Sequence, residues 1–114
     1  MKSIILSAIL AAATSAPAFS AEPIEGVWKR PNGTMIRYSA AGGGKFCGKV
    51  LNNEYKGQSI GCMEGSGAAY KGKVNKLDEG KTYVGKAHVN GNMLKLSGCA
   101  LLGLVCKSEN LARQ

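Results

Sequence analysis

The sequence predicts a small all-β protein, an antiparallel barrel or sandwich of about eight short strands. Three observations support this prediction. Apolar and polar residues alternate over short segments, turn residues interrupt those segments at regular intervals, and a five-residue pattern recurs three times. Alternation places successive side chains on opposite faces of a strand, and short strands joined by tight turns are typical of antiparallel barrels and sandwiches.

Turn residues divide the chain into these strands. Asn32-Gly33, Gly42-Gly43-Gly44, Asp78-Glu79-Gly80 and Asn90-Gly91 separate the alternating segments. Asn-Gly between two such segments is a strong hairpin signal, because a type I′ turn needs positive φ at both central residues. The strands expected between the turns span residues 25–30, 34–39, 45–52, 58–63, 68–76, 81–89, 92–99 and 103–111.

The recurring pattern is an aromatic residue, any residue, glycine, lysine and a small apolar residue. It occurs at residues 46–50, 70–74 and 83–87. Because side chains alternate, the aromatic, the glycine and the small residue share one face, whereas the lysine lies on the other. A mid-strand glycine beneath an aromatic ring lets a sheet bend sharply. The repeat therefore favours a barrel with an apolar inner face and a solvated outer face.

Closure of such a barrel brings its first and last strands together. We therefore expect Trp28, on the first strand, to pack against Arg113, at the end of the last strand. A guanidinium group over an indole ring contributes about 0.5–2 kcal/mol, depending on exposure. The alternative is that Trp28 only fills the bottom of the barrel.

The first residues have the pattern of a cleaved export signal. Lys2 supplies a positive charge, and residues 4–13 are almost entirely Ile, Leu and Ala. Small residues precede a cleavage site just before Ala21, or one residue later. The apolar stretch is shorter than the roughly 20 residues that span a bilayer. We expect residues 1–20 to be removed and residues 21–114 to form one domain in the periplasm, with no membrane span and no lipid anchor.

The four cysteines are expected to form two structural disulfides. An even number of cysteines in a small exported domain is typical of a disulfide framework. The pairs Cys47–Cys62 and Cys99–Cys106 are favoured, because each brackets a predicted hairpin. In the chain-entropy model the two links contribute about 3 and 2.5 kcal/mol. A metal site or a redox-active pair is the alternative, but the chain has no C-x-x-C motif and the cysteine spacings do not fit a zinc knuckle.

Several short motifs, taken in order along the chain, resemble a known family. The motifs are Gly26-Val27-Trp28, Cys47-Gly48-Lys49-Val50, Gly80-Lys81-Thr82-Tyr83, Leu94-Lys95-Leu96-Ser97-Gly98-Cys99 and a closing Arg113. Together they are similar to the small secreted bacterial family called domain of unknown function 2147. The resemblance covers nearly all of the chain after the export signal. It implies a lipocalin-like up-and-down β-barrel in the periplasm, with no established activity.

The chain departs from the pattern of that family at two places. Leu111 stands where the family usually has a tryptophan, and the short segment 52–59 replaces a loop rich in aspartate and proline. Pocket features that depend on this tryptophan or this loop are therefore not carried over to the chain.

The residue types argue against an enzyme. Hydrolysis or group transfer usually needs a nucleophile with its base, a pair of carboxylates or a metal. His88 is the single histidine, and its place in the alternation puts it on the outer face. The seven carboxylates show no repeated spacing, and the glycines at 42–44 lack the helix and hydroxyl residue of a phosphate loop. We expect no catalytic residues, no metal site and no cofactor.

The positive charge of the chain is the sequence feature that bears most directly on function. Residues 21–114 keep 14 of the 15 basic residues and all 7 acidic ones, a net charge of +7. The alternation places five lysines on the outer face: Lys49, Lys71, Lys73, Lys86 and Lys95. Such a face attracts anions, although lysines also simply keep a barrel exterior soluble. Nucleic acid is excluded as a partner, because export separates the protein from it and stacking needs exposed aromatic rings.

Two functions remain. The first is a non-enzymatic binding or interaction module whose basic outer face meets an anionic envelope component or an acidic protein. The alternative is a lipocalin-like carrier with a small apolar ligand inside the barrel. Large inner residues favour a filled core, and small ones favour a cavity. The inner set leaves this choice open: Phe46, Tyr70, Val74, Tyr83, Leu94 and Leu96 against Gly48, Gly72, Gly85 and Ala87.

Overall fold

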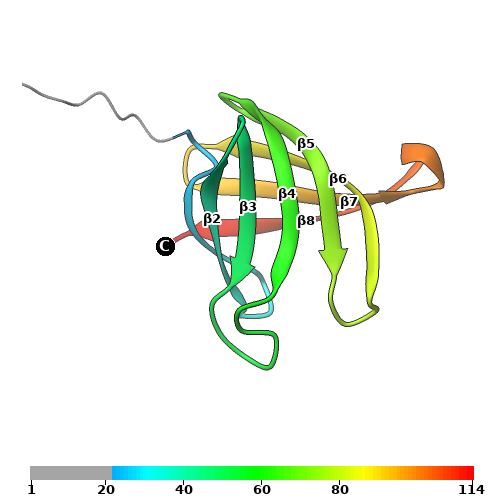
Figure 1. Cartoon of the computed structure of the whole chain (residues 1–114), viewed down its shortest axis with the longest axis horizontal. Helices are drawn as coiled ribbons and strands as arrows, with labels where there is room; N and C mark the ends of the chain where they lie inside the picture. The colour runs from blue at the N-terminus through cyan, green and yellow to red at the C-terminus, as the bar shows by residue number, and fades with distance from the viewer. Residues whose placement is uncertain (1–21) are drawn as a thin grey trace, which may run out of the picture.

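The protein is a closed antiparallel β-barrel of eight strands, seen in a computed structural model that describes residues 22–114 (Figure 1). Each strand pairs with the next along the chain, and β1 pairs with β8 to close the barrel. The strands are β1 Gly26–Lys29, β2 Met35–Gly42, β3 Lys45–Val50, β4 Ser59–Ser66, β5 Ala69–Lys76, β6 Lys81–Asn90, β7 Met93–Ala100 and β8 Val105–Arg113. The predicted antiparallel barrel is confirmed, and every expected strand overlaps an observed one. The expected export signal, residues 1–20, lies outside the described residues.

Within residues 22–114, no helix is long and apolar enough to cross a membrane.

The tight turns follow the glycines. Gly43 and Gly44 connect β2 to β3, and both have the positive φ that a two-residue turn of this kind requires, 63° and 77°. The β6–β7 turn lies one residue later than the expected Asn90-Gly91 pair, because Asn90 already pairs with Met93. The turn residues are therefore Gly91 and Asn92, and φ is positive at Gly91.

The repeated pattern places its residues on the two faces as expected. Phe46 and Tyr70 point inward and are buried, and their rings meet edge to face at 5.8 Å between centroids. The lysines of the pattern point outward and are exposed. Alternation between an apolar lumen and a charged exterior thus holds along β3, β5 and β6.

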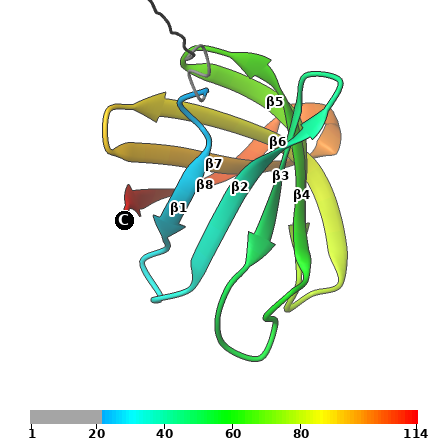
Figure 2. The ribbon, with the colours of Figure 1, turned by 60° about the vertical axis from the view of Figure 1, so that its left-hand side comes forward.

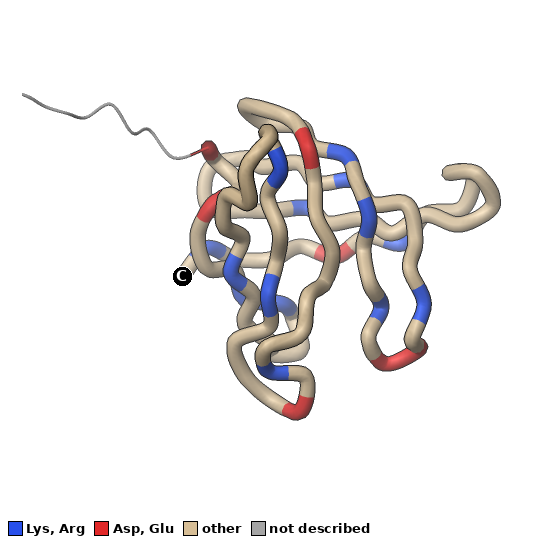
Figure 3. Tube along the Cα trace, in the orientation of Figure 1, with Lys and Arg blue, Asp and Glu red and all other residues tan. Residues whose placement is uncertain are grey.

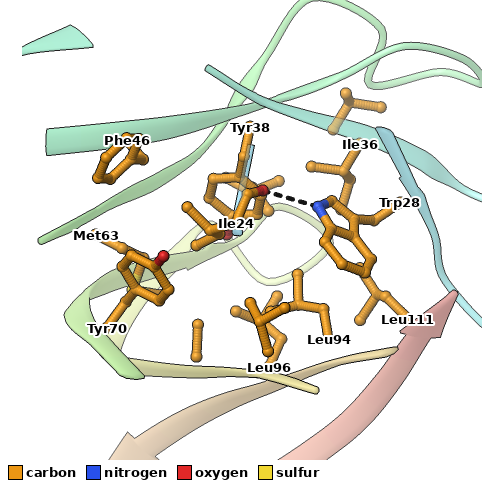
Figure 4. Packing of buried hydrophobic residues seen from close by; sticks show 14 residues of the cluster. Ile24, Trp28, Ile36, Tyr38, Phe46, Met63, Tyr70, Leu94, Leu96 and Leu111 are labelled. Atoms are coloured by element: carbon orange, nitrogen blue, oxygen red, sulfur yellow. Dashed lines mark hydrogen bonds between the residues drawn. The ribbon is translucent and has the colours of Figure 1, made fainter. Parts of the chain in front are cut away.

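A close-packed core fills one end of the barrel, which we call the closed end (Figure 4). Fully buried side chains there include Trp28, Tyr38, Tyr70, Leu94 and Leu111. Leu111 occupies the position where the resembling family has a tryptophan, and it is completely buried beside Trp28. The substitution therefore keeps an apolar residue in the core.

The segment that precedes β1 covers this closed end (Figure 2). Ile24 in this segment is completely buried, and its carbonyl oxygen accepts a hydrogen bond from Trp28 Nε1 at 2.9 Å. Glu22 accepts hydrogen bonds from the backbone N–H of Gly67 and from the hydroxyl of Tyr70. The segment is thus tied both to β1 and to the β4–β5 turn.

Arg113 links the last strand to the first. Its Cζ lies 4.2 Å from the centroid of the Trp28 ring, and the two residues are direct partners in the β1–β8 ladder. The guanidinium group also donates hydrogen bonds to the carbonyl oxygens of Glu25, at 3.0 Å, and Pro23, at 2.7 Å. The expected contact between Trp28 and Arg113 is present, and Arg113 holds the covering segment in place as well.

The opposite end of the barrel is less tightly closed, because pairing between neighbouring strands stops early there. The β6–β7 ladder ends at Val84 and Cys99, so residues 81–83 of β6 have no partner in β7. The β4–β5 ladder begins only at Met63 and Gly72. The β5–β6 hairpin and the β7–β8 hairpin consequently separate from each other at this end, which we call the open end (Figures 1 and 2).

Candidate ligand-binding cavity

A cavity of about 640 Å³ lies in the open half of the barrel. Its deepest residues are the inward-facing side chains of four strands: Ile36 on β2, Val50 on β3, Ile60 on β4 and Leu96 on β7. Each of these side chains is buried in the hydrophobic core. The closed-end core therefore forms the apolar floor of the cavity.

Partly buried apolar side chains extend the wall from this floor toward solvent. Val74 on β5, Leu77 after β5 and Tyr55 in the β3–β4 loop pack against the core and line the cavity. Tyr55 is held in place by its loop: Asn53 Oδ1 accepts a hydrogen bond from the Tyr55 backbone N–H, and Asn53 Nδ2 donates to Thr34 Oγ1. The short loop 52–59 thus supplies part of the cavity wall.

Four connections surround the mouth of the cavity, and they place polar groups there. Lining residues come from the β1–β2 turn, the β3–β4 loop, the β5–β6 turn and the base of the β7–β8 hairpin. Arg30 Nε donates to Glu109 Oε2 at 2.7 Å, which joins the first connection to β8. Both side chains are about one-third exposed. The cavity therefore changes from apolar at its floor to charged at its mouth.

A second charged group lies at the β5–β6 turn. Lys76 Nζ lies 3.0 Å from Asp78 Oδ2 and 3.5 Å from Glu79 Oε2, and Tyr83 donates its hydroxyl to Glu79 at 2.8 Å. The hydrogen bond from Lys76 lowers the pKa of Asp78, and the hydrogen bond from Tyr83 lowers the pKa of Glu79. The pKa of Lys76 is raised, chiefly by its hydrogen bond to Asp78. All three groups are therefore charged at neutral pH.

The charged groups at the mouth are engaged with one another, which suits binding better than proton transfer. Each carboxylate named above has a cation or a hydroxyl donor beside it. In the part of the chain that the structure describes, no group of three or more His, Cys, Asp or Glu residues could hold a metal ion. His88 is exposed on the outer face opposite Lys95, away from the residues that line the cavity.

The five lysines of the expected anion-binding face are all exposed. Lys and Arg residues are spread over several strands around the barrel (Figure 3). Lys71 and Lys86 are direct partners on β5 and β6, Lys73 is two residues from Lys71, and Lys95 lies on β7. These four residues are called the lysine group below. Lys49 lies on β3 opposite Arg37, with β4 between it and β5. It therefore belongs to a different part of the surface from the other four lysines.

The two expected disulfides are confirmed. Cys47 is linked to Cys62 and Cys99 to Cys106, and each pair is directly opposite in its ladder, with 4.0 Å between Cα atoms. Both links therefore join neighbouring strands of a hairpin. Disulfides of this kind persist in oxidising compartments, which indicates an extracytoplasmic environment for the protein.

The pattern of the sequence does not point to the residues that surround the cavity mouth. One signal was present: in the hairpin register around the Cys99–Cys106 link, Glu109 is opposite Leu96, which the alternation already places inside. A carboxylate at an inward position needs a partner, because burial of an unpaired charge is costly. Its partner, Arg30, lies 79 residues earlier in the chain, so the pair could not be identified from local pattern.

Comparison with protein-family models, with curated proteins and with solved structures finds no match to this chain. The similarity to the family called domain of unknown function 2147 stays a prediction from the motifs.

Proposed function

We propose that the protein is a non-enzymatic binding protein, which takes one small amphipathic ligand in the open half of the barrel. The observation that supports this most is the cavity, whose volume of about 640 Å³ lies in the range of about 300–1,000 Å³ typical of small-molecule pockets. Its floor is apolar and its mouth is charged, so the apolar part of a ligand would lie inward and its polar head outward. The proposal therefore favours the carrier over the interaction module.

The distribution of large and small inner residues supports this choice. Phe46, Tyr70 and Leu94 are buried in the closed half, whereas Val74 and Tyr83 are half-buried in the wall of the open half. The barrel is thus filled at one end and hollow at the other. A carrier needs only one such compartment, as long as the floor keeps the barrel folded without ligand.

A cavity-filling substitution tests the proposal. Val74→Trp places a large ring in the cavity, and we expect the affinity for the uncharged probe N-phenylnaphthylamine to fall about tenfold or more. Val84→Trp is the matched control, because Val84 is the same residue type on the neighbouring strand but is half exposed on the outside. Its probe affinity should equal that of the parent.

The melting temperature of each variant controls for misfolding. If Val74→Trp does not fold, Leu77→Trp at the edge of the same wall replaces it. A parent protein that does not bind the probe, or a folded Val74→Trp variant that binds it unchanged, would contradict the proposed cavity site.

The lysine group supports a second candidate function, attachment to an anionic surface of the cell envelope. Lys71 and Lys86 are direct cross-strand partners, and like charges in that position destabilise a sheet. Glu64, directly opposite Lys71 on β4, offsets part of this repulsion, and a bound anion beside Lys86 would relieve the rest. The periplasm is the compartment we propose for both functions, since the disulfides require oxidising conditions.

Charge-matched variants test this second candidate. Lys71→Gln with Lys86→Gln should weaken binding to vesicles that contain anionic lipid by about thirtyfold, since each lysine near such a surface contributes about 1 kcal/mol. Lys29→Gln with Lys56→Gln removes the same charge from exposed positions on β1 and in the β3–β4 loop, outside the row of Lys71 and Lys86, and should change binding much less. Equal losses in the two double variants would show that only net charge matters.

A further inference from the structure

The turn between β7 and β8 exposes an unusual amount of apolar surface. Leu101 is 70% exposed, Leu102 100%, Leu104 85% and Val105 50%. These four residues are called the apolar tip below. The hairpin that carries them projects away from the barrel (Figure 1). Single exposed apolar residues are ordinary on protein surfaces, but four neighbouring ones on a projecting turn indicate an interaction site.

The backbone of the tip shows that these side chains are not there to make the turn. Leu101 and Leu102 have φ of 51° and 59°, in the left-handed region, and Gly103 follows with φ of 88°. Bulky residues rarely adopt this region, which costs about 1–2 kcal/mol for each L-residue other than glycine and, at times, asparagine or aspartate. Asparagine or glycine at both positions would form the same turn more easily. The leucine side chains therefore serve something other than local stability.

The Cys99–Cys106 disulfide supports the tip from its base. The two cysteines are partners in the β7–β8 ladder. The next pair toward the turn is Ala100 and Val105. No residue of the turn Leu101–Gly103 is buried, so packing does not hold the turn in place. The covalent link restricts the conformations of a segment that would otherwise move freely. The apolar side chains are thus presented on a stiff support.

The charges around the tip favour an anionic surface as its partner. No charged residue occurs from residue 96 to residue 106, and Lys107 follows directly. On the outer face, the row that contains Cys99 continues through Val84 to Lys73, and the next row contains Lys86 and Lys71, with Glu64 opposite Lys71 on β4. The lysine group therefore begins beside the base of the tip. The carboxylates of the adjacent β5–β6 turn, Asp78 and Glu79, are paired with Lys76.

We propose that the apolar tip inserts into the surface of a lipid bilayer that contains anionic lipids. Apolar side chains that enter the boundary between headgroups and acyl chains, next to lysines that contact anionic headgroups, are the two components of peripheral membrane binding. Lys73 and Lys107, the lysines beside the base of the tip, provide charge complementarity with anionic lipid next to the apolar contact, whereas Lys95 lies toward the closed end.

A protein partner fits the same surface less well. Binding energy between proteins is concentrated in Trp, Tyr and Arg, with leucine and valine under-represented, and the tip contains only aliphatic residues. A stable interface also buries about 800 Å² on each partner, more than four aliphatic side chains supply. Aliphatic side chains spread around a tight turn suit a fluid hydrocarbon region, which needs no shape complementarity.

The tip lies at the edge of the proposed ligand cavity. Val105 of the tip and its ladder partner Ala100 line the cavity wall where β7 and β8 separate from the β5–β6 hairpin. Insertion of the tip would hold the cavity mouth close to the bilayer, so that an amphipathic lipid could pass between the two. This passage rests on the proposed carrier function, whereas the docking itself does not.

Vesicle flotation with a strain-relieving variant tests the docking. The double variant Leu101→Asn, Leu102→Asn removes two apolar side chains and places asparagine at two left-handed positions, which asparagine tolerates. We expect its melting temperature to equal or exceed that of the parent. Its partition into vesicles of mixed zwitterionic and anionic lipid should fall at least about tenfold, since insertion of even one leucine contributes that much. Opposite effects on stability and binding exclude misfolding as the cause.

Met93→Asn is the control, because Met93 is 44% exposed on the β6–β7 hairpin at the other end of the barrel. Its partition should equal that of the parent. Leu102→Trp adds a direct readout: its emission should shift to the blue when anionic vesicles are added. N-phenylnaphthylamine binding without vesicles should be the same in the double asparagine variant and the parent. A loss of flotation with intact probe binding therefore separates docking from the carrier function.

Three results would overturn the docking proposal. The first is a parent protein that does not float with anionic vesicles even at low salt. The second is a double asparagine variant that floats as well as the parent, in which case the lysines alone bind the vesicles. The third is self-association of the parent that the asparagine substitutions abolish, combined with a Leu102→Trp emission that does not shift on vesicles. In that case the tip is a contact between two copies of the chain.

Discussion

Replacement of Arg113 should show how far barrel closure depends on one side chain. Its guanidinium group lies 4.2 Å from the Trp28 ring centroid and donates hydrogen bonds to the carbonyl oxygens of Glu25 and Pro23. The cation–π contact contributes about 0.5–2 kcal/mol, and a hydrogen bond from a charged donor about 1.5–3 kcal/mol, reduced here because Arg113 is partly exposed. We expect Arg113→Ala to lower the free energy of unfolding by about 2–3 kcal/mol.

In a domain of this size that loss corresponds to a fall in melting temperature of roughly 10–20 °C. Trp28 is the single tryptophan, so its fluorescence reports both the unfolding transition and the environment of the closure. Arg113→Lys keeps the cation but loses the planar fork, and it should lie between the parent and the alanine variant. Arg37→Ala, an exposed position on β2, should change stability by no more than about 0.5 kcal/mol. Unchanged melting temperature and unchanged tryptophan emission in Arg113→Ala would refute this account of closure.

Three other predictions concern the core and the disulfides. The hydroxyl of Tyr38 is buried and has no hydrogen-bond partner among the described residues, so Tyr38→Phe should leave thermal stability unchanged or raise it by up to about 1 kcal/mol. Burial raises the pKa of Tyr70 to about 12 and that of Tyr38 still further, so these tyrosines should leave stability constant from neutral pH to about pH 10 and lower it as the pH rises through 12, measured as alkaline unfolding with tyrosinate absorbance. Replacement of Cys99 and Cys106 with serine should lower the free energy of unfolding by about 2.5 kcal/mol in a denaturant titration, and a free thiol in the exported parent protein would contradict the pairing.

The features that local pattern could predict are those determined by alternation and turns. The repeat around Phe46, Tyr70 and Tyr83 established which face of each strand points inward, and the structure follows it. The cysteine pairing followed from the same hairpins, because partners in a two-strand ladder lie close enough for a disulfide. Each of these features depends on residues within about one hairpin of each other.

The features that could not be predicted depend on contacts between distant parts of the chain. Glu22 reaches the β4–β5 turn, and Arg30 reaches Glu109, through the closure of the whole barrel. The hollow half arises where neighbouring strands stop pairing, for which the sequence has no local signal. Consequently the inner residues, counted together, could not distinguish a filled barrel from an open one.

The inner glycines show why that count was uninformative. A Cβ atom at Gly72 would collide with the carbonyl oxygen of Cys62, and one at Gly85 would meet the Met63 and Val74 side chains within 2.7 Å. These glycines let neighbouring strands and side chains approach, and they do not leave empty space. Enlarging them should therefore disrupt the fold, so that Val74 is the better position for filling the cavity.

Native mass spectrometry of the exported protein tests the carrier proposal most directly. The parent protein, purified without detergent from cells that export it, should carry a non-covalent adduct of one small amphipathic molecule, released by organic solvent. Val74→Trp should lack the adduct and Val84→Trp should keep it, because the first ring fills the cavity and the second lies outside. A parent protein that has only its own mass and takes up no added amphipathic lipid would contradict the account, as would an adduct retained by folded Val74→Trp.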